Sequence, residues 1–224
     1  MSPMTRSKQD YLKALFALAP AGDTVGTSQL ASQLRVSPPS VTNMLARLAR
    51  ERLVAHAPRA GTRLTARGRR VALGMVRRHR ILETFLVRVL GLDWAEVHAD
   101  AEVLEHHVSD RVLAALDRLM GHPEEDPHGH PIPDARGRMR RRALRPIASL
   151  APGQRATVRE IRDLEQARVT RWRELGLVPG AAIRLRVVRA LDGVLEMDVG
   201  GRRRVLAGQG LEGVMVELRK GNPR

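Results

Sequence analysis

Apolar residues recur every three or four positions through most of the first 120 residues, which predicts a series of amphipathic helices. Ser37 is a suitable N-cap for one of them, and the Pro38 that follows is tolerated in the first turn of a helix. Two short apolar runs flank a basic turn at Gly61 and predict a two-stranded ribbon. The elements expected here are helices over residues 10–18, 28–34 and 38–52, then strands over residues 53–58 and 62–65.

The periodicity then changes along the rest of the chain. Two longer helices are predicted over residues 66–89 and 94–120, each stopped by a glycine. Residues 122–145 contain four prolines by Pro133 and then a run rich in arginine, as in a linker. Beyond it, alternating apolar and polar residues separated by turn signals predict five short strands of a small, partly open barrel. These strands are expected over residues 156–161, 183–188, 194–199, 203–206 and 214–218.

The expected fold class is therefore mainly α with β, divided into four segments. Residues 1–74 form a winged helix-turn-helix and residues 75–121 a helical domain, followed by the linker over residues 122–145. Residues 146–224 form the small β-barrel.

Charge is distributed unevenly over these segments. The chain of 224 residues carries a net charge of +15, but residues 75–125 hold 6 basic and 10 acidic side chains. Residues 1–74 hold 12 basic and 3 acidic side chains, which suits a partner rich in phosphate. With no cysteine, no signal-peptide pattern and no apolar run of about 18 residues, we expect a cytoplasmic protein without disulfides, thiolate metal sites or membrane contact.

The second helix of the helix-turn-helix carries the candidate DNA-reading side chains. Ser40, Asn43 and Arg47 fall on one face, opposite the apolar stripe, and Asn43 has the chemistry to read an adenine edge. Double-stranded DNA is the partner that this pattern and the basic charge predict. An ordinary three-helix core with a solvated polar face is the alternative. The residues expected to contact DNA are Thr27, Ser28, Ser37, Pro39, Ser40, Thr42, Asn43, Arg47, Arg50, Arg59 and Arg63.

Histidines and carboxylates share helical faces in the acidic centre. Glu102, Glu105 and His106 stand at i, i+3 and i+4, and His98 lies one turn before Glu102. On the preceding helix, His79 and Glu83 form another such pair. Neutralisation of these carboxylates by neighbouring arginines is the alternative to a metal site. Oxygen and nitrogen ligands without sulfur favour a hard or borderline divalent ion. His107, His122, His128 and His130 are expected to be surface or linker histidines.

Several motifs together resemble the diphtheria-toxin-repressor family of metal-dependent transcriptional repressors, over nearly the whole chain. They are Asp10-Tyr11-Leu12, the segments 36–42, 64–68, 78–83 and 102–106, and Gly129-His130-Pro131-Ile132-Pro133. The segment 175–180 is similar to the SH3-like third domain that this family shares with ferrous-iron-transport accessory proteins. The resemblance implies a winged helix-turn-helix, a helical metal-binding and dimerisation domain, and an SH3-like C-terminal barrel.

The resemblance also implies two metal positions. The primary, activating position would use Asp10, Glu102, Glu105 and His106. The ancillary position would use His79, Glu83 and His98, with Glu165 lent by the third domain. Arg168 stands where iron-type members carry a neutral ligand, and Lys13 stands where manganese regulators carry a second acid, so a closely spaced two-manganese cluster is not expected.

Carboxylates at positions 10 and 102 replace the methionine and cysteine of iron-type members. This replacement makes Mn(II) the expected metal, with Fe(II) possible and other divalent transition metals able to substitute in vitro.

The function that follows is metal-dependent repression: a metal-loaded homodimer binds palindromic operators and silences metal-uptake genes. No catalytic residue and no small-molecule substrate are expected. Two other classes stay open, a metallohydrolase that uses the His and Glu cluster to activate water, and a metal-independent architectural DNA-binding protein. Against the hydrolase, no Gly-rich phosphate loop, nucleophile elbow or His-Glu-x-x-His motif occurs.

Overall fold

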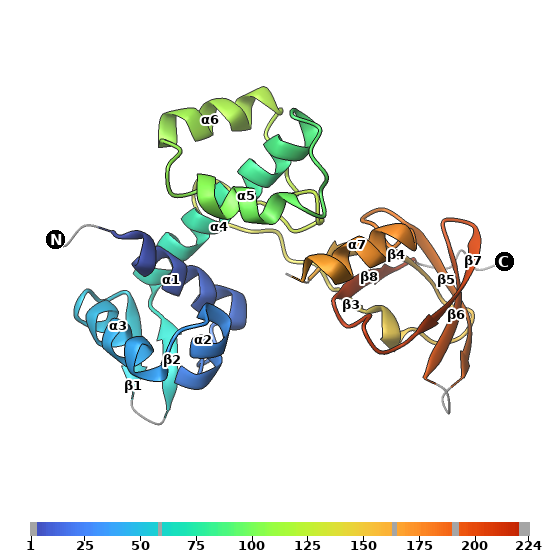
Figure 1. Cartoon of the computed structure of the whole chain (residues 1–224), viewed down its shortest axis with the longest axis horizontal. Coiled ribbons are helices and arrows are strands. Elements are labelled where there is room, and N and C mark those ends of the chain that lie inside the picture. The colour runs from blue at the N-terminus through green and yellow to red at the C-terminus, as the bar shows by residue number, and fades with distance from the viewer. Residues whose placement is uncertain (1–3, 58–59, 163–164, 190–192, 220–224) are drawn as a thin grey trace. The chain divides into compact units, whose positions relative to one another are not determined.

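A computed structural model describes residues 4–57, 60–162, 165–189 and 193–219 (Figure 1). The chain separates into two compact units, each considered by itself below. The first comprises residues 1–79 with 133–139, and the second comprises residues 80–132 with 140–224. No helix in the described ranges combines the length and the apolar character that a membrane-spanning segment needs.

The first unit is a winged helix-turn-helix, as predicted. Its elements are α1 (Arg6–Leu18), α2 (Thr27–Leu34), α3 (Pro38–Arg50), β1 (Val54–Ala57), β2 (Gly61–Leu64) and the first part of α4 (Ala66–Arg88). Ser37 caps α3, because its Oγ accepts a hydrogen bond from Ser40 N at 3.4 Å. The two strands pair antiparallel, with Val54 opposite Leu64. Leucines at positions 12, 15, 30, 45, 48 and 53 are all buried in one core with the neighbouring helices.

A close backbone contact fixes where α4 leaves the wing. A Cβ added to Gly68 would lie 1.9 Å from the carbonyl oxygen of Leu53, so only glycine fits. The Thr65 hydroxyl supports the same junction by donating a hydrogen bond to Arg52 O at 2.8 Å and accepting one from Gly68 N at 3.0 Å. The wing and the base of α4 are therefore held together.

The single helix expected over residues 94–120 is wrong, because the chain breaks it into α5 (Val97–Leu104) and α6 (Asp110–Leu119). Ser109 is the reason: its side chain accepts a hydrogen bond from Val112 N at 3.3 Å and starts a new helix. Glu105 and His106 consequently lie at the end of α5, outside a regular helix. The helix predicted over residues 66–89 is confirmed as α4.

The expected linker begins with a folded turn. Its ends are joined by a hydrogen bond from Ile132 N to Glu124 O at 2.8 Å, and its centre by one from Asp126 N to His130 O at 3.0 Å. Asp126, His128 and Ile132 are buried. The prolines of this segment therefore shape a compact turn, which we call the 124–132 turn.

The C-terminal part of the second unit is a six-stranded antiparallel sheet with a helix packed against it. The elements are β3 (Arg145–Pro146), η1 (Ile147–Ser149), β4 (Arg155–Ile161), α7 (Gln166–Glu174), β5 (Ala182–Arg189), β6 (Val194–Val199), β7 (Arg202–Ala207) and β8 (Val214–Leu218). The strand order is β3-β8-β4-β5-β6-β7, and in the described residues the sheet is not closed into a barrel. All five predicted strands are present. Helix α7 was not predicted, and its Val169 and Trp172 are buried against the sheet.

The core of this domain also includes residues that precede α5. Ala95 is buried in it and Trp94 packs against it. Asp93 forms an ion pair with Arg173 of α7. Within the second unit, the loop between α4 and α5 is thus joined to the C-terminal sheet domain by both apolar and charged contacts.

Candidate metal centre and DNA-binding surface

The exposed face of α3 carries the predicted DNA-reading residues. Ser40, Asn43 and Arg47 are exposed, whereas Val41, Leu45 and Leu48 are buried in the core, as the helical spacing predicted.

The other predicted DNA-contacting residues differ in solvent exposure and in the hydrogen bonds that they already form. Arg50 and Arg63 are exposed, while the Thr42 hydroxyl donates a hydrogen bond to Pro38 O at 3.1 Å within its own helix. Ser37 is occupied as the N-cap described above. Thr27 begins α2 and Ser28 follows in its first turn. Pro39 lies in the first turn of α3, and Arg59 lies outside the described residues.

An ion pair with one buried partner joins α1 to the end of α3. The ammonium of Lys8 lies 2.6 Å from Glu51 Oε1, and the Lys8 side chain is 9% exposed. Glu51 is the C-cap of α3. The first helix and the DNA-reading helix are therefore held by a short charged contact in addition to their apolar packing.

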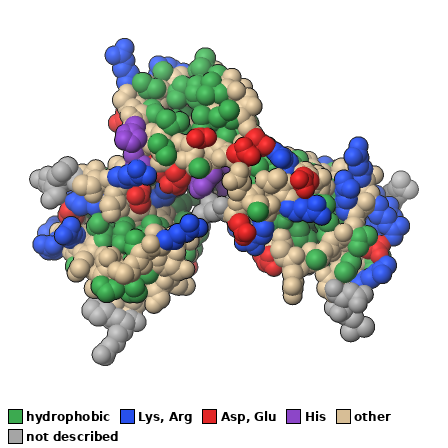
Figure 2. Space-filling view, viewed as in Figure 1, with side chains coloured by type: hydrophobic (Ala, Val, Ile, Leu, Met, Phe, Trp, Pro, Cys, Tyr) green, Lys and Arg blue, Asp and Glu red, His purple; other side chains and the backbone are tan. Residues whose placement is uncertain are grey.

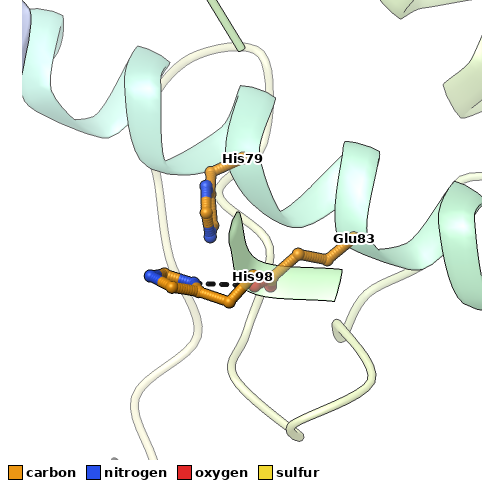
Figure 3. Close-up of side chains that lie close together, drawn as sticks. All are labelled: His79, Glu83 and His98. Carbon is orange, nitrogen blue, oxygen red and sulfur yellow. Dashed lines mark hydrogen bonds and ion pairs between the residues drawn. The ribbon is translucent and has the colours of Figure 1, made fainter. Parts of the chain in front are cut away.

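Two of the predicted ancillary ligands meet inside the second unit. Glu83 on α4 is buried, and its Oε1 is hydrogen-bonded to His98 Nδ1 on α5 at 3.1 Å. His79 stands one turn earlier on α4, and the continuous helix presents its ring to the same side, as Figure 3 shows. The three side chains offer one ligand atom each within 4.8 Å of one another. Two imidazoles and a carboxylate at this spacing are a donor set that fits a divalent transition ion.

The ammonium of Lys13 lies beside this set. Its Nζ is 3.1 Å from His79 Nδ1, and both residues belong to the first unit. A fixed positive charge at this position opposes a further cation there.

The predicted primary ligands Glu102, Glu105 and His106 lie around the end of α5. Glu105 is buried, and the side chain of His106 is 4% exposed. His106 Nε2 is shielded from solvent and lies 3.6 Å from Glu105 Oε1, which is longer than a hydrogen bond. Glu102 Oε1 lies 3.7 Å from His98 Nε2. A buried imidazole nitrogen beside a buried carboxylate, at a spacing wider than a hydrogen bond, fits a cation that binds to both.

The remaining predicted ligands, Asp10 and Glu165, lie on neither α4 nor α5. Asp10 lies on α1 in the first unit and is half-buried. Glu165 is the exposed N-cap residue of α7 and pairs with Arg168 at 3.0 Å. Among the described residues, the groups with metal-ligand spacing do not include Glu165.

Sequence reasoning missed a third group of side chains, in the 124–132 turn. His128 is buried, not a surface residue, and its Nδ1 lies 3.7 Å from Glu83 Oε2. His130 is half-buried and its Nδ1 is 3.1 Å from Asp126 Oδ2. Helical periodicity has no means of finding these contacts, because the turn and α4 are about forty residues apart.

The Asp126 carboxylate organises the turn as an anion. Burial disfavours its charged form, but His130 and Arg80 outweigh that effect, and the pKa of Asp126 is held below its ordinary value. Its Oδ1 accepts hydrogen bonds from the backbone N–H groups of His128 and His130, both at 2.9 Å. Burial lowers the pKa of Arg80, while the neighbouring carboxylates of Asp126 and Glu83 favour its charge.

Known proteins with similar sequences match in three consecutive segments. Residues 3–62 match the family described as the iron dependent repressor, N-terminal DNA binding domain. Residues 65–134 match the iron dependent repressor, metal binding and dimerisation domain, and residues 145–218 match the FeoA domain.

Individual relatives with similar sequences are also named as repressors. The chain is 35% identical over 133 residues to the iron-dependent repressor of Mycobacterium leprae and 32% identical over 133 residues to the diphtheria toxin repressor of Corynebacterium diphtheriae. Each match covers 59% of this chain and spans 58% and 59% of the two relatives, respectively.

Solved structures extend the likeness to 94% of the chain. A manganese-dependent transcriptional repressor in complex with manganese has a TM-score of 0.87 and 36% identity, covering 94% of this chain and 99% of that one. A second manganese-dependent transcriptional repressor has a TM-score of 0.78 and 33% identity, with 94% and 100% covered. With the winged helix, the His and carboxylate groups and the C-terminal sheet domain, these likenesses show that the chain belongs to the diphtheria-toxin-repressor family of metal-dependent repressors.

Proposed function

We propose that this protein is a metal-activated transcriptional repressor that binds palindromic operators as a homodimer and silences metal-uptake genes. One observation supports this most directly. The chain combines a winged helix-turn-helix that exposes Asn43 and Arg47 with a separate set of buried histidines and carboxylates around Glu83 and Glu105. A DNA-reading surface and a metal-binding set in one chain are the two parts that a metal-responsive repressor requires.

The activating metal is assigned to Asp10, Glu102, Glu105 and His106, and the ancillary metal to His79, Glu83 and His98. Three carboxylates against one imidazole make the first set rich in hard oxygen donors, which favours Mn(II), with Fe(II) as the alternative. Glu165 is the weakest member of the assignment, because it is exposed and paired with Arg168. A divalent ion at the first set supplies the positive charge that lets its three carboxylates approach one another.

Activation is a coupling between the two units of the chain. Asp10 belongs to α1 of the DNA-binding unit, whereas Glu105 and His106 belong to the second unit. A ligand set divided in this way favours only those arrangements in which α1 lies within reach of the α5 end. A change from mostly inactive to mostly active protein requires roughly 5 kcal/mol of differential affinity.

DNA recognition is assigned to the exposed face of α3 and to the wing. Asn43 has the donor and acceptor pair that suits an adenine edge in the major groove. Arg47, Arg50 and Arg63 are positioned to contact phosphates, which supplies affinity without sequence preference.

The dimer is assigned to exposed apolar side chains of the helical domain. Leu90, Val103, Val112 and Leu119 are between 49% and 67% exposed, and Figure 2 shows hydrophobic side chains gathered over α6. Two such surfaces packed together place two recognition helices on one palindromic site. The same proposal includes no catalytic residue and a cytoplasmic location.

The experiment is a DNA-selection assay with genomic fragments, run with Mn(II), with anaerobic Fe(II) and with chelator. We expect a palindromic site to be enriched only when metal is present. Glu105→Ala is expected to abolish this metal response, whereas Asp100→Ala removes an exposed acid of the same helix and preserves it. Equal enrichment with chelator would contradict the proposal and favour an architectural DNA-binding protein. Hydrolysis of a generic phosphoester with Mn(II), lost in Glu105→Ala, would favour the metallohydrolase.

A further inference from the structure

Two arginines occupy left-handed backbone positions where the two helices of the helix-turn-helix end. Arg35 is the C-cap of α2 and has a φ of +53°, and Arg52 comes two residues after the end of α3 with a φ of +57°. A residue with a Cβ is strained at these angles, and glycine is the usual residue at such a helix ending. Both arginines therefore stand where the backbone favours a different residue.

Other helices of this chain show the same type of ending with glycine in place of arginine. In α2, α3, α6 and α7 a backbone N–H after the helix donates to the carbonyl oxygen five residues earlier. These bonds run from Val36 to Ala31, Leu53 to Leu48, His122 to Asp117 and Leu177 to Trp172. The residue before the donor is Gly121 after α6 and Gly176 after α7, both at positive φ. Because the four endings share one hydrogen-bond pattern, the fold does not require arginine at two of them.

The charged groups of both arginines are available to a partner. Arg35 and Arg52 are exposed, and within the described parts of the chain their guanidinium groups form no hydrogen bond or ion pair. Other cations of the same unit are engaged, as in the hydrogen bond from Arg69 Nη1 to Pro20 O at 2.8 Å. Attraction to the carbonyl end of the helix is the alternative explanation for an arginine at this position.

The two arginines flank the recognition helix. Arg35 lies two residues before Ser37, the N-cap of α3, and Arg52 lies two residues after Arg50, its last residue. With 13 residues, α3 is about 20 Å long. The major groove of DNA is about 12 Å wide, so a helix of this length that crosses the groove extends past both of its walls. Phosphates border these walls, and the guanidinium group matches phosphate oxygens in charge and geometry.

We propose that Arg35 and Arg52 contact phosphates at the two ends of the recognition helix, one on each DNA strand that borders the groove. This inference rests on the DNA-binding face of the proposed function and deepens it by two residues outside α3 and the wing. The contacts supply affinity that does not depend on base sequence and fix how α3 lies across the groove. The backbone strain at both positions is retained because the side chains bind DNA.

The test is a salt titration of DNA binding by the full-length protein, with Mn(II) and a fluorescently labelled duplex of mixed sequence. The variants are Arg35→Asn and Arg52→Asn, because asparagine tolerates left-handed backbone angles. Each is expected to bind about tenfold more weakly near physiological salt. The slope of log affinity against log salt should fall by about 0.9 for each bound subunit. Arg155→Asn is the control, because it removes an exposed arginine of β4 and should keep the slope.

Two further measurements separate a phosphate contact from a role in folding. Arg35→Lys and Arg52→Lys keep the positive charge and should retain the slope and most of the affinity. The thermal midpoint of the two asparagine variants should equal or exceed that of wild type, because the relief of backbone strain offsets the lost charge at the helix end. A residue that only ends a helix would instead lose stability and leave the salt slope unchanged.

Three results would overturn the inference. An unchanged slope and affinity in both asparagine variants would make Arg35 and Arg52 solvated surface residues. Weaker binding with an unchanged slope, or a loss that lysine does not restore, would make them structural residues of the helix ends. An equal loss in Arg155→Asn would assign the effect to net charge alone. If Arg35→Asn does not fold, Arg35→Gly is titrated under the same criteria, because glycine adopts the same angles without strain.

The proposed function is judged separately, on the wild-type protein alone. Its criterion is the metal dependence of operator selection, so its failure is distinct from a failure of the two arginines to change the salt slope. A wild-type protein that binds no DNA under either condition would overturn both.

Discussion

Replacing Gly129 by alanine should separate the 124–132 turn from the C-terminal sheet. Gly129 has a φ of +84°, and a Cβ at this position would lie 1.8 Å from the carbonyl oxygen of Arg159. Because that oxygen belongs to the backbone of β4, the two segments must move apart by more than about 1 Å to restore van der Waals contact. A movement of this size disrupts the hydrogen bond from Ile161 N to His128 O and the one from Arg142 to Gly129 O.

The expected cost is the sum of strain and lost contacts. An alanine with left-handed backbone angles costs roughly 1–2 kcal/mol, and each lost hydrogen bond costs about 1 kcal/mol. The local opening of the turn should therefore become easier by about 3 kcal/mol, or about a hundredfold in the exchange rate of the Ile161 amide hydrogen.

Gly153→Ala is the matched control for this experiment. Gly153 has the same φ of +84° in the same unit, but a Cβ there meets no atom within 4 Å. This variant carries the strain alone, so its effect on exchange at Ile161 should be no more than about thirtyfold. Native-state hydrogen exchange of both variants gives the comparison. Equal exchange in the two variants would refute the claim that the turn and β4 are in close contact.

Three further predictions follow from single side chains. Glu196→Gln should lower stability at neutral pH, because the hydrogen bond from Arg203 holds the pKa of Glu196 below its ordinary value. The difference in stability from wild type should shrink as pH falls through that pKa. Urea unfolding at several pH values measures this difference, and a difference that grows in acid would contradict the prediction. Leu119→Arg places a charge on a side chain that is 67% exposed, and sedimentation should show monomers; an unchanged dimer would exclude this surface. Lys13→Glu replaces the ammonium 3.1 Å from His79 Nδ1 by a ligand group, so Mn(II) should bind about tenfold more tightly or in greater number. Lys13→Met is the control, because it removes the ammonium without adding a ligand. Electron paramagnetic resonance of free Mn(II) counts the bound ions, and equal binding in the two variants would reject the effect of the new carboxylate.

Most of the architecture follows from local rules. Ser37 and Pro38 define the start of α3, because the hydroxyl cap and the first-turn proline act within three residues. The apolar stripe through Val41, Leu45 and Leu48 identifies the buried face of the same helix, so its exposed face was predictable as well. The five strands of the C-terminal domain were predictable for the same reason, since strand alternation and turn residues are also local signals.

Other features depend on contacts between distant segments. The break between α5 and α6 depends on one capping hydroxyl within a stretch that remains apolar at helical spacing on both sides. His128 reaches Glu83 only after the 124–132 turn has folded against α4 and β4, and prolines in the sequence suggested a linker there. The metal-ligand assignments of the sequence stay predictions. The structure supplies spacing for His79, Glu83 and His98, and it leaves Glu165 exposed beside Arg168.

The ion pair between Lys8 and Glu51 bears on how a signal crosses the DNA-binding unit. Lys8 is two residues before Asp10, and Glu51 is the residue that ends α3. A displacement of α1 by the proposed metal at Asp10 would therefore reach the end of α3 through this ion pair and through the apolar packing between the two helices. Because α3 is already a formed helix with a buried apolar face, such a displacement would change its orientation without unfolding it. Operator affinity would then depend on the orientation of a helix that is already folded, and activation would cost little conformational entropy.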